Sequence, residues 1–197
     1  MIPALILAAG ASRRMGTQKL LLPWNGVPVL CHIALQLEQA GVNPIHVVSG
    51  HDHEKLQQAL EGLSITFTRN ADYESGMLSS VRCGIQALPP TAQQVLIALG
   101  DHPQLDVAVV QALLQTAAAH PEAIVVPMHE GRKGHPIVLP RRYWSQLMDS
   151  YDDVGLRGLL RDEADSIIGI GAPASIREDL DTPEDYERAL AAIQQAN

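Results

Sequence analysis

The 197-residue sequence is poor in aromatic and in basic residues. Phe, Trp and Tyr make up 4% of the chain, and 14 Lys and Arg stand against 22 Asp and Glu, for a formal net charge of −8. Nucleic-acid binding relies on cations that neutralise phosphates, so an acidic chain of this kind is not expected to bind nucleic acid. The same balance still permits a local basic pocket for one small anion.

Cysteine and long hydrophobic runs are also scarce. The chain has two cysteines, Cys31 and Cys83, which excludes a disulfide-rich scaffold, and we expect both to be small buried residues. No apolar run reaches the roughly 18 residues that a membrane span requires, so no membrane partner is expected. The first seven residues lack a basic region before their apolar run. They predict a first strand instead of a signal peptide, and a cytoplasmic, reducing location.

Apolar residues are plentiful, at 46% of the chain, which is enough for the core of one domain over residues 1–197. Apolar runs alternate with amphipathic segments. This order predicts an α/β, three-layer, Rossmann-like fold with a mostly parallel sheet. We expect strands at 4–8, 45–48, 65–68, 95–99, 124–127 and 167–170, and helices at 29–40, 53–60, 79–88, 106–119, 156–160 and 183–194. Residues 129–134 predict a turn-rich loop, and residues 136–139 predict an antiparallel strand.

A glycine-rich segment, LAAGASRRMGTQK at residues 7–19, follows the first predicted strand. Its glycines permit tight turns, and exposed backbone N–H groups in such a loop form an anion-binding concavity. Arg13, Arg14 and Lys19 bring three cations to it, which favours a polyphosphate ligand. The spacing fits neither the Walker A nor the dinucleotide-binding pattern, so neither an ATPase nor a hydride-transfer enzyme is indicated. A structural turn with surface arginines is the alternative.

One carboxylate follows the fourth predicted strand, in the sequence LGDHP at residues 99–103. Ligands of doubly wound sheets bind outside the carboxyl ends of the strands, so Asp101 is expected to face that crevice. Mg²⁺ prefers one or two carboxylates together with substrate phosphates, which makes Asp101 the first candidate ligand. The alternative is a turn aspartate beside a proline.

The segment NADYESGMLSSV at residues 70–81 follows the third predicted strand. It offers small polar groups, a flexible Gly76 and a helix N-terminus, where backbone donors favour anions or polar bases. Ordinary helix capping by Ser79 is an equally good explanation for any single residue of this segment.

Histidines give weaker signals. His135, in a Gly-His-Pro segment, is suited to orienting a phosphate, to approaching a metal or to a purely structural hydrogen bond. His51 and His53 lie just beyond the second strand but have no third ligand with matching spacing, so a zinc site is not expected.

These segments, in order, resemble the signatures of sugar-nucleotide-type nucleotidyltransferases, and most of all the MobA-like branch that attaches nucleotides to molybdopterin. The resemblance extends from residue 5 to residue 188. Residues 7–19 are similar to the Leu-Ala-Ala/Gly-Gly-x-Ser-x-Arg-Met-Gly-x-x-Lys signature, and residues 179–185 to a closing Asp-Ile/Leu-Asp-Thr-Pro-Glu-Asp segment. The resemblance implies a fold of the nucleotide-diphospho-sugar transferase type.

The resemblance also implies roles for individual residues. It implies a metal-binding Gly-Asp-x-Pro at Asp101 and a second metal contact at Asp181, although that segment is equally well suited to starting a helix. Arg14, Lys19 and Asp101 are the expected catalytic residues. The residues implied to bind the nucleotide are Leu7, Ala8, Ala9, Gly10, Arg13, Arg14, Lys19, Asn70, Gly76 and Ser80. The residues implied to line the acceptor side are Gly134, His135 and Pro136, although Leu139 replaces the Phe that the family has after them.

We therefore expect a Mg²⁺-dependent nucleotidyltransferase that acts on a nucleoside triphosphate and a molybdopterin-type acceptor. The acceptor phosphate is already ionised, so positioning and charge neutralisation dominate and no general base is assigned. In the branch, Leu-Ala-Ala-Gly accompanies cytidylyl transfer and Leu-Ala-Gly-Gly guanylyl transfer. Ala9 therefore favours CTP, with its methyl group narrowing the space beside the base.

Other functions stay open at this point. The nearest alternatives are guanylyl transfer to molybdopterin and nucleotidyl transfer to a sugar or alditol phosphate. An alternative of another class is a non-catalytic accessory protein that binds molybdopterin or a nucleotide. Such a protein would serve a molybdenum hydroxylase or its chaperone, which are also the macromolecular partners expected for an enzyme.

Overall fold

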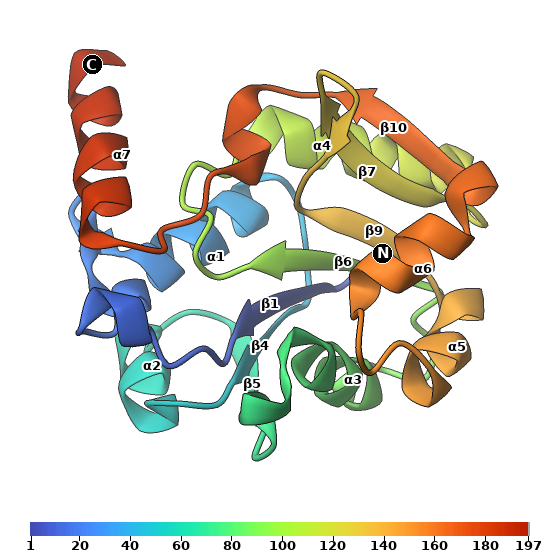
Figure 1. Ribbon diagram of the computed structural model, residues 1–197, viewed down its shortest axis with the longest axis horizontal. Coiled ribbons are helices and arrows are strands. Elements are labelled where there is room, and N and C mark those ends of the chain that lie inside the picture. The colour runs from blue at the N-terminus through green and yellow to red at the C-terminus, as the bar shows by residue number, and fades with distance from the viewer. Residues whose placement is uncertain (197) are drawn as a thin grey trace.

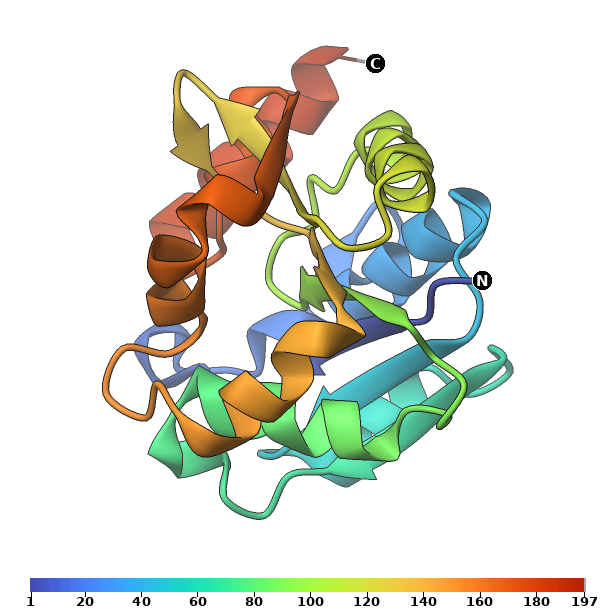
Figure 2. The ribbon, with the colours of Figure 1, turned by 90° about the vertical axis from the view of Figure 1, so that its right-hand side faces the viewer.

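A twisted eight-stranded sheet forms the centre of the molecule, with helices packed on both of its faces (Figures 1 and 2). The computed structural model describes residues 1–196, with side chains through residue 192. The strand order is β10-β7-β9-β6-β1-β4-β5, and β8 pairs with β7. The strands are β1 Ala4–Ala8, β4 Ile45–Ser49, β5 Ile65–Arg69, β6 Gln94–Leu99, β7 Ile124–His129, β8 Arg132–Lys133, β9 Ile137–Pro140 and β10 Ile167–Gly171.

Seven α-helices are described, and all of them contribute to one of two apolar clusters, with Ala189 of α7 belonging to the same cluster as α1, α2 and α4. Helices α1, α2 and α4 pack on one face, where Ile6 of β1 points, and α3, α5 and α6 pack on the other, where Leu5 points. Both side chains are fully buried, as a strand covered on two faces requires. The helices are α1 Val29–Gln39, α2 His53–Ala59, α3 Met77–Ala87, α4 Val107–Ala119, α5 Trp144–Asp149, α6 Leu156–Asp162 and α7 Pro183–Ala196.

Strand directions confirm the predicted mostly parallel sheet with an antiparallel member. Strand β1 is parallel to both β4 and β6, and β10 is parallel to β7. Strand β9 is antiparallel to β6 and to β7, so the prediction of an antiparallel strand near residues 136–139 is confirmed. The chain therefore has the three-layer α/β fold expected from its sequence.

The loop predicted over residues 129–134 is instead a hairpin. Strand β7 continues to His129, which pairs with Arg132 of β8. Glu130 and Gly131 form the turn with φ of 47° and 76°. Paired left-handed residues match the twist of a two-residue hairpin, and for that reason the strand pairing continues through the segment.

Two further elements are absent from the sequence prediction. A second hairpin joins β2 (Pro23–Trp24) to β3 (Val27–Pro28), and its Asn-Gly turn at residues 25–26 is the standard signal for such a connection. Trp24, 1% exposed, anchors it in the core. Helix α5 is also additional, and α3 begins at Met77 instead of Ser79.

The cysteines are less buried than predicted. Cys31 and Cys83 are half-buried and free, and each packs against the edge of an apolar cluster. Partial burial raises the pKa of both thiols above the usual value. Across residues 1–196, no helix combines the length and the apolar character needed to cross a lipid bilayer.

Candidate active site

The glycine-rich segment forms a tight loop after β1. Ser12 adopts a left-handed conformation with φ of 49°, and Gly16, with φ of 66°, ends a short 3₁₀ turn at Arg13–Met15. The Ser12 hydroxyl donates to Oε1 of Gln18 at 2.9 Å and accepts the backbone N–H of Lys19 at 3.2 Å. These bonds fold the loop back on itself and fix the position from which the Lys19 side chain leaves the backbone.

A cleft of about 530 Å³ lies against this loop, and we call it the loop cleft. It brings together eight of the residues singled out from the sequence, which are Leu7, Ala8, Gly10, Arg13, Arg14, Lys19, Asp101 and Asp181. The additional lining residues are Ala11, Ser12, Leu20, Tyr73 and Glu74. The cleft lies beyond the carboxyl ends of β1 and β6, where ligands of this class of sheet bind.

Lys19 lies between two carboxylates at the floor of the loop cleft. Its Nζ is 2.6 Å from Oδ2 of Asp101 and 3.2 Å from Oδ1 of Asp181. Burial acts to lower the pKa of Lys19, but the charges and hydrogen bonds of the two carboxylates outweigh it, so the pKa lies above the usual value. Lys19 is therefore a charged ammonium at neutral pH.

Asp101 and Asp181 are held together by the backbone as well as by Lys19. The backbone N–H of Leu180 donates to the carbonyl oxygen of Asp101 at 3.0 Å, and the Leu180 side chain is buried. This bond ties the segment before α7 to the end of β6. The backbones that carry the two carboxylates are therefore joined directly, and both carboxylates reach the same ammonium.

Two arginines extend the positive charge along the cleft. Arg14 is 2.9 Å from the other oxygen of Asp181, and Arg13 is 2.6 Å from Glu74. The Arg13 pair is largely exposed, and exposed ion pairs of this kind contribute only about 0–1 kcal/mol. Both guanidinium groups can therefore exchange these partners for a ligand's phosphates at little cost.

The metal expected from the sequence fits the two carboxylates of the cleft. Asp101 and Asp181 retain 25% and 30% exposure, and their oxygens converge on a single cation, the Lys19 ammonium. Among residues 1–196, no group of three or more His, Cys, Asp or Glu side chains is arranged to hold a metal ion. An ion bound here would therefore need further ligands from phosphates or water, which is the manner in which Mg²⁺ usually binds.

Four of the predicted nucleotide-binding residues do not line the cleft. Asn70, 5% exposed, donates from Nδ2 to the hydroxyls of Ser79 and Ser80 at 2.8 and 3.0 Å, so it fixes the loop before α3 from within. Ala9 is 7% exposed, and Gly76 is exposed outside the cleft. Nucleotide contact at Ala9, Asn70, Gly76 and Ser80 stays a prediction.

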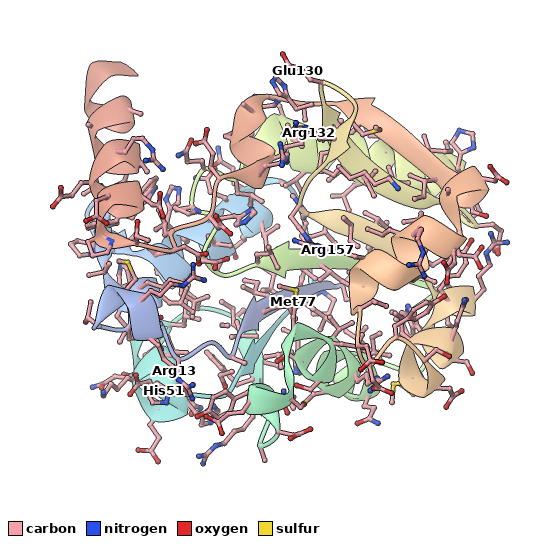
Figure 3. All side chains as sticks on the ribbon, in the orientation of Figure 1. Arg13, His51, Met77, Glu130, Arg132 and Arg157 are labelled. Carbon is pink, nitrogen blue, oxygen red and sulfur yellow. The ribbon has the colours of Figure 1, made fainter. Side chains whose placement is uncertain are left out.

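A second cavity of about 970 Å³ adjoins the first, and we call it the basic cavity. Two of the predicted acceptor residues, Gly134 and His135, line it, whereas Pro136 is buried behind them. Its charged lining residues are Lys133, Arg157, Arg161, Arg177 and Asp179. Figure 3 shows Arg157, from α6, and Met77, from the start of α3, near each other at the centre of this face.

Two of these cations have no carboxylate partner. Within residues 1–192, neither Arg157 nor Arg177 forms an ion pair. Arg161 pairs with the adjacent Asp162, and Lys133 donates to a backbone carbonyl of α6. In an acidic chain, such a concentration of cations favours an anionic ligand.

His135 is neutral at the wall of the basic cavity. Burial, reinforced by the nearby His102, lowers the pKa of His135 to about 4, and burial also lowers the pKa of His102. The two rings lie edge to face with centroids 6.0 Å apart, and Nδ1 of each is buried without a hydrogen-bond partner among the described residues. His135 is therefore suited to a neutral hydrogen bond and not to a cationic clamp on phosphate.

Sequence reasoning missed several participants. Gln18, 8% exposed, stabilises the loop from inside but occupies a variable position of the signature. Glu74 pairs with Arg13 across 61 residues, and Arg157 and Arg177 reach the basic cavity from separate elements. The arginines that follow residue 150, among them Arg157, Arg161 and Arg177, are the sequence signal that could have found the last two.

Comparison with known proteins identifies the family of this chain. Residues 4–167 match the family model of the MobA-like NTP transferase domain. The chain is 27% identical to the molybdenum cofactor cytidylyltransferase of Escherichia coli (strain K12) over 186 residues, which cover 94% of this chain and 93% of that protein. It is 31% identical to a probable molybdenum cofactor guanylyltransferase of Natronomonas pharaonis over 194 residues, covering 93% and 94%.

A solved structure shares the fold over nearly the whole chain. The crystal structure of Rv0371c from Mycobacterium tuberculosis H37Rv superposes with a TM-score of 0.84 at 26% identity, covering 97% of this chain and 98% of that one. The same protein has been solved in complex with manganese, with a TM-score of 0.79. The family match over residues 4–167 and the full-length relatives show that this chain belongs to the MobA-like NTP transferase family and is a nucleotidyltransferase.

Proposed function

We propose that the protein transfers CMP from CTP to the phosphate of molybdopterin, in the biosynthesis of the molybdenum cofactor, with Mg²⁺ as the metal. The observation that carries the proposal is the convergence of Lys19, Asp101 and Asp181 at the floor of the loop cleft, beside a cavity rich in cations. The proposed nucleotidyltransferase domain is residues 1–197, of which residue 197 lies outside the described part of the chain.

The chain's own residues bind and orient the reacting groups. Arg14 and Lys19 bind the triphosphate, and the backbone of the glycine-rich loop receives the nucleoside. Asp101 and Asp181 hold Mg²⁺, which neutralises charge on the phosphate oxygens when bound. The acceptor phosphate oxygen forms a bond to the α-phosphorus, the bond to the bridging oxygen breaks, and pyrophosphate leaves. The acceptor oxygen is already ionised, so the residues need only position it.

The choice of CTP rests on the resemblance and not on the cleft's shape. The predicted reason, that the Ala9 methyl group narrows the space beside the base, gains no support from the loop cleft, because Ala9 is 7% exposed and does not line it. The Ala9 carbonyl oxygen instead accepts the backbone N–H of His51 at 3.2 Å. Support for CTP comes from the Leu-Ala-Ala-Gly pattern and from the cytidylyltransferase relative. The 31% identical relative is named a probable guanylyltransferase, which keeps GTP as the second candidate.

Pyrophosphate release tests the proposal. Purified protein with Mg²⁺, CTP and molybdopterin is expected to release pyrophosphate faster than the same mixture with GTP. Each reaction lacking molybdopterin serves as the control. Molybdopterin-dependent release with GTP but not with CTP would favour the guanylyltransferase alternative. If neither CTP nor GTP gave pyrophosphate, transfer to molybdopterin would be excluded.

Nucleotide binding, compared with pyrophosphate release, distinguishes an enzyme from a non-catalytic accessory protein. Ligand binding raises the unfolding temperature by mass action, so CTP is expected to protect the protein more than GTP does. Protection by a nucleotide without pyrophosphate release would support the accessory alternative. Delivery of the product to a molybdenum hydroxylase or its chaperone is a further part of the proposal.

Replacement of Arg157 tests the assignment of the basic cavity to the acceptor. Arg157→Gln is expected to raise the KM for molybdopterin by roughly ten- to a hundredfold, since a charge-assisted hydrogen bond contributes about 1.5–3 kcal/mol. The KM for CTP is expected to stay near the wild-type value. Steady-state kinetics with each substrate varied in turn measures both constants.

Arg132→Gln is the matched control for this experiment. Arg132 lies on the β7–β8 hairpin, away from Arg157 in Figure 3, and does not line the basic cavity. Its substitution removes the same charge but should leave both KM values unchanged. Equal effects of the two substitutions would contradict a specific role for Arg157.

A further inference from the structure

The gap between Asp101 and Asp181 is filled by a side chain of the protein itself. The Lys19 ammonium contacts one oxygen of each carboxylate, at 2.6 and 3.2 Å, and the Lys19 side chain is 12% exposed. Arg14 contacts the remaining Oδ2 of Asp181 at 2.9 Å. Three of the four carboxylate oxygens that suit a divalent cation, both of Asp181 and Oδ2 of Asp101, are therefore in contact with the chain's own cations.

An ammonium and a metal ion cannot share this position. A Mg²⁺ ion binds carboxylate oxygens at about 2.0–2.1 Å, and an ammonium held at hydrogen-bond distance from the same oxygens would lie against it with like charge. The Leu180 N–H donates to the Asp101 carbonyl and joins the backbones of the two segments, so the gap does not widen by backbone separation to admit both cations. Lys19 must therefore leave this gap when a metal enters.

We propose that Lys19 holds the metal position closed until a nucleoside triphosphate binds. The triphosphate offers the Lys19 ammonium and the Arg14 guanidinium an alternative set of anionic oxygens in the same cleft. Transfer of these cations to the phosphates frees both carboxylates for the metal. The metal consequently enters with the nucleotide and not before it, an order of binding that rests on the proposed function of the loop cleft.

Lys19 is well placed for such an exchange. The Ser12 hydroxyl accepts the backbone N–H of Lys19 and donates to Oε1 of Gln18, and these hydrogen bonds hold the Lys19 backbone in place. The exchange therefore requires movement of the Lys19 side chain alone. The Lys19 side chain and both carboxylates line the same loop cleft, so the ammonium passes from one set of oxygens to the other without crossing the core. The charge near the carboxylates then changes from an ammonium to a divalent ion, with the phosphates balancing the difference.

Metal binding in the absence of nucleotide tests the proposal. Free Mn²⁺ is followed by electron paramagnetic resonance as protein is titrated, with no nucleotide and no acceptor present. Lys19→Met removes the ammonium but retains the length of the side chain. It is expected to bind one Mn²⁺ with a dissociation constant at least about tenfold lower than that of the wild type, because a like charge in contact with the metal site is lost.

Lys55→Met is the matched control for the loss of one lysine charge. Lys55 lies outside the loop cleft and pairs with Asp52, and not with Asp101 or Asp181. Its substitution should leave Mn²⁺ affinity unchanged. Circular dichroism and the unfolding temperature establish that each variant is folded, and Lys19→Gln replaces Lys19→Met if the latter does not fold.

The wild-type protein supplies a second test that needs no Lys19 variant. If Lys19 closes the site, nucleotide-free wild type should bind no more Mn²⁺ than Asp181→Asn does. Tight Mn²⁺ binding by the wild type, or equal affinities for wild type and Lys19→Met, would overturn the proposal. These titrations contain neither CTP nor molybdopterin, so their outcome is separate from that of the pyrophosphate assay.

Discussion

Asp101→Asn is expected to lower the rate of nucleotidyl transfer by roughly a hundred- to a thousandfold, the cost typical of removing one group that stabilises developing charge. The substitution replaces a carboxylate that faces Lys19 and the proposed metal position with a neutral amide of the same shape. The Asp101 side chain is 25% exposed in the loop cleft, so the folded structure should tolerate the change. Pyrophosphate release measures the rate, and circular dichroism and the unfolding temperature measure folding.

Asp152→Asn is the control for Asp101→Asn. Asp152 also pairs with a cation, Arg82 at 2.6 Å, but its side chain is 74% exposed and lies outside both cavities. Its substitution should leave the transfer rate within the error of the wild type. If Asp101→Asn transferred the nucleotide at the wild-type rate, with either CTP or GTP, Asp101 would not be a catalytic residue.

Gly134→Ala is expected to destabilise the protein by about 1–3 kcal/mol, the range typical of overpacking. A Cβ atom at this position would lie 2.5 Å from the backbone oxygen of Ile176 and 2.6 Å from its side chain. That oxygen accepts the backbone N–H of His135 at 3.0 Å, so the clash also displaces the wall of the basic cavity. Urea denaturation measures the free energy of unfolding, and the KM for molybdopterin is expected to rise in parallel.

Gly171→Ala makes the same chemical change without the clash. A Cβ atom at Gly171 would meet nothing within 4 Å among the described residues, so its effect on unfolding should stay within about 0.5 kcal/mol. A Gly134→Ala variant as stable as this control would show that the contact with Ile176 is not tightly packed.

The type and order of the main elements follow from local sequence patterns. The continuous apolar run of β1 predicted a strand buried on both faces, and both Leu5 and Ile6 are fully buried. The break in rhythm near residue 136 predicted the antiparallel β9. These predictions succeed because periodicity and turn residues act within a few positions of one another.

Short elements were harder to predict. Helix α5 has six residues, too few for a helical period to stand out from an apolar run. The β7–β8 hairpin turns on Glu130, a residue that rarely adopts a left-handed conformation, with φ of 47°. In both places the tertiary packing decides the conformation against a weak local preference.

The sequence by itself identified the cations and Asp101 of the candidate site, because a glycine-rich loop after a first strand and an aspartate after a later strand meet at the same edge of a parallel sheet. Asp181 was added by the family resemblance. Only the tertiary structure decided their pairing. Lys19 contacts Asp101 and Asp181 across 82 and 162 residues, at distances that no local pattern encodes.

The burial of individual side chains also depended on the tertiary structure. It turned Asn70 into an internal hydrogen-bonding residue and lowered the pKa of His135 to about 4, since both effects depend on which distant segments cover the side chain. The sequence thus determined which chemical groups are available, and the fold determined which of them face one another.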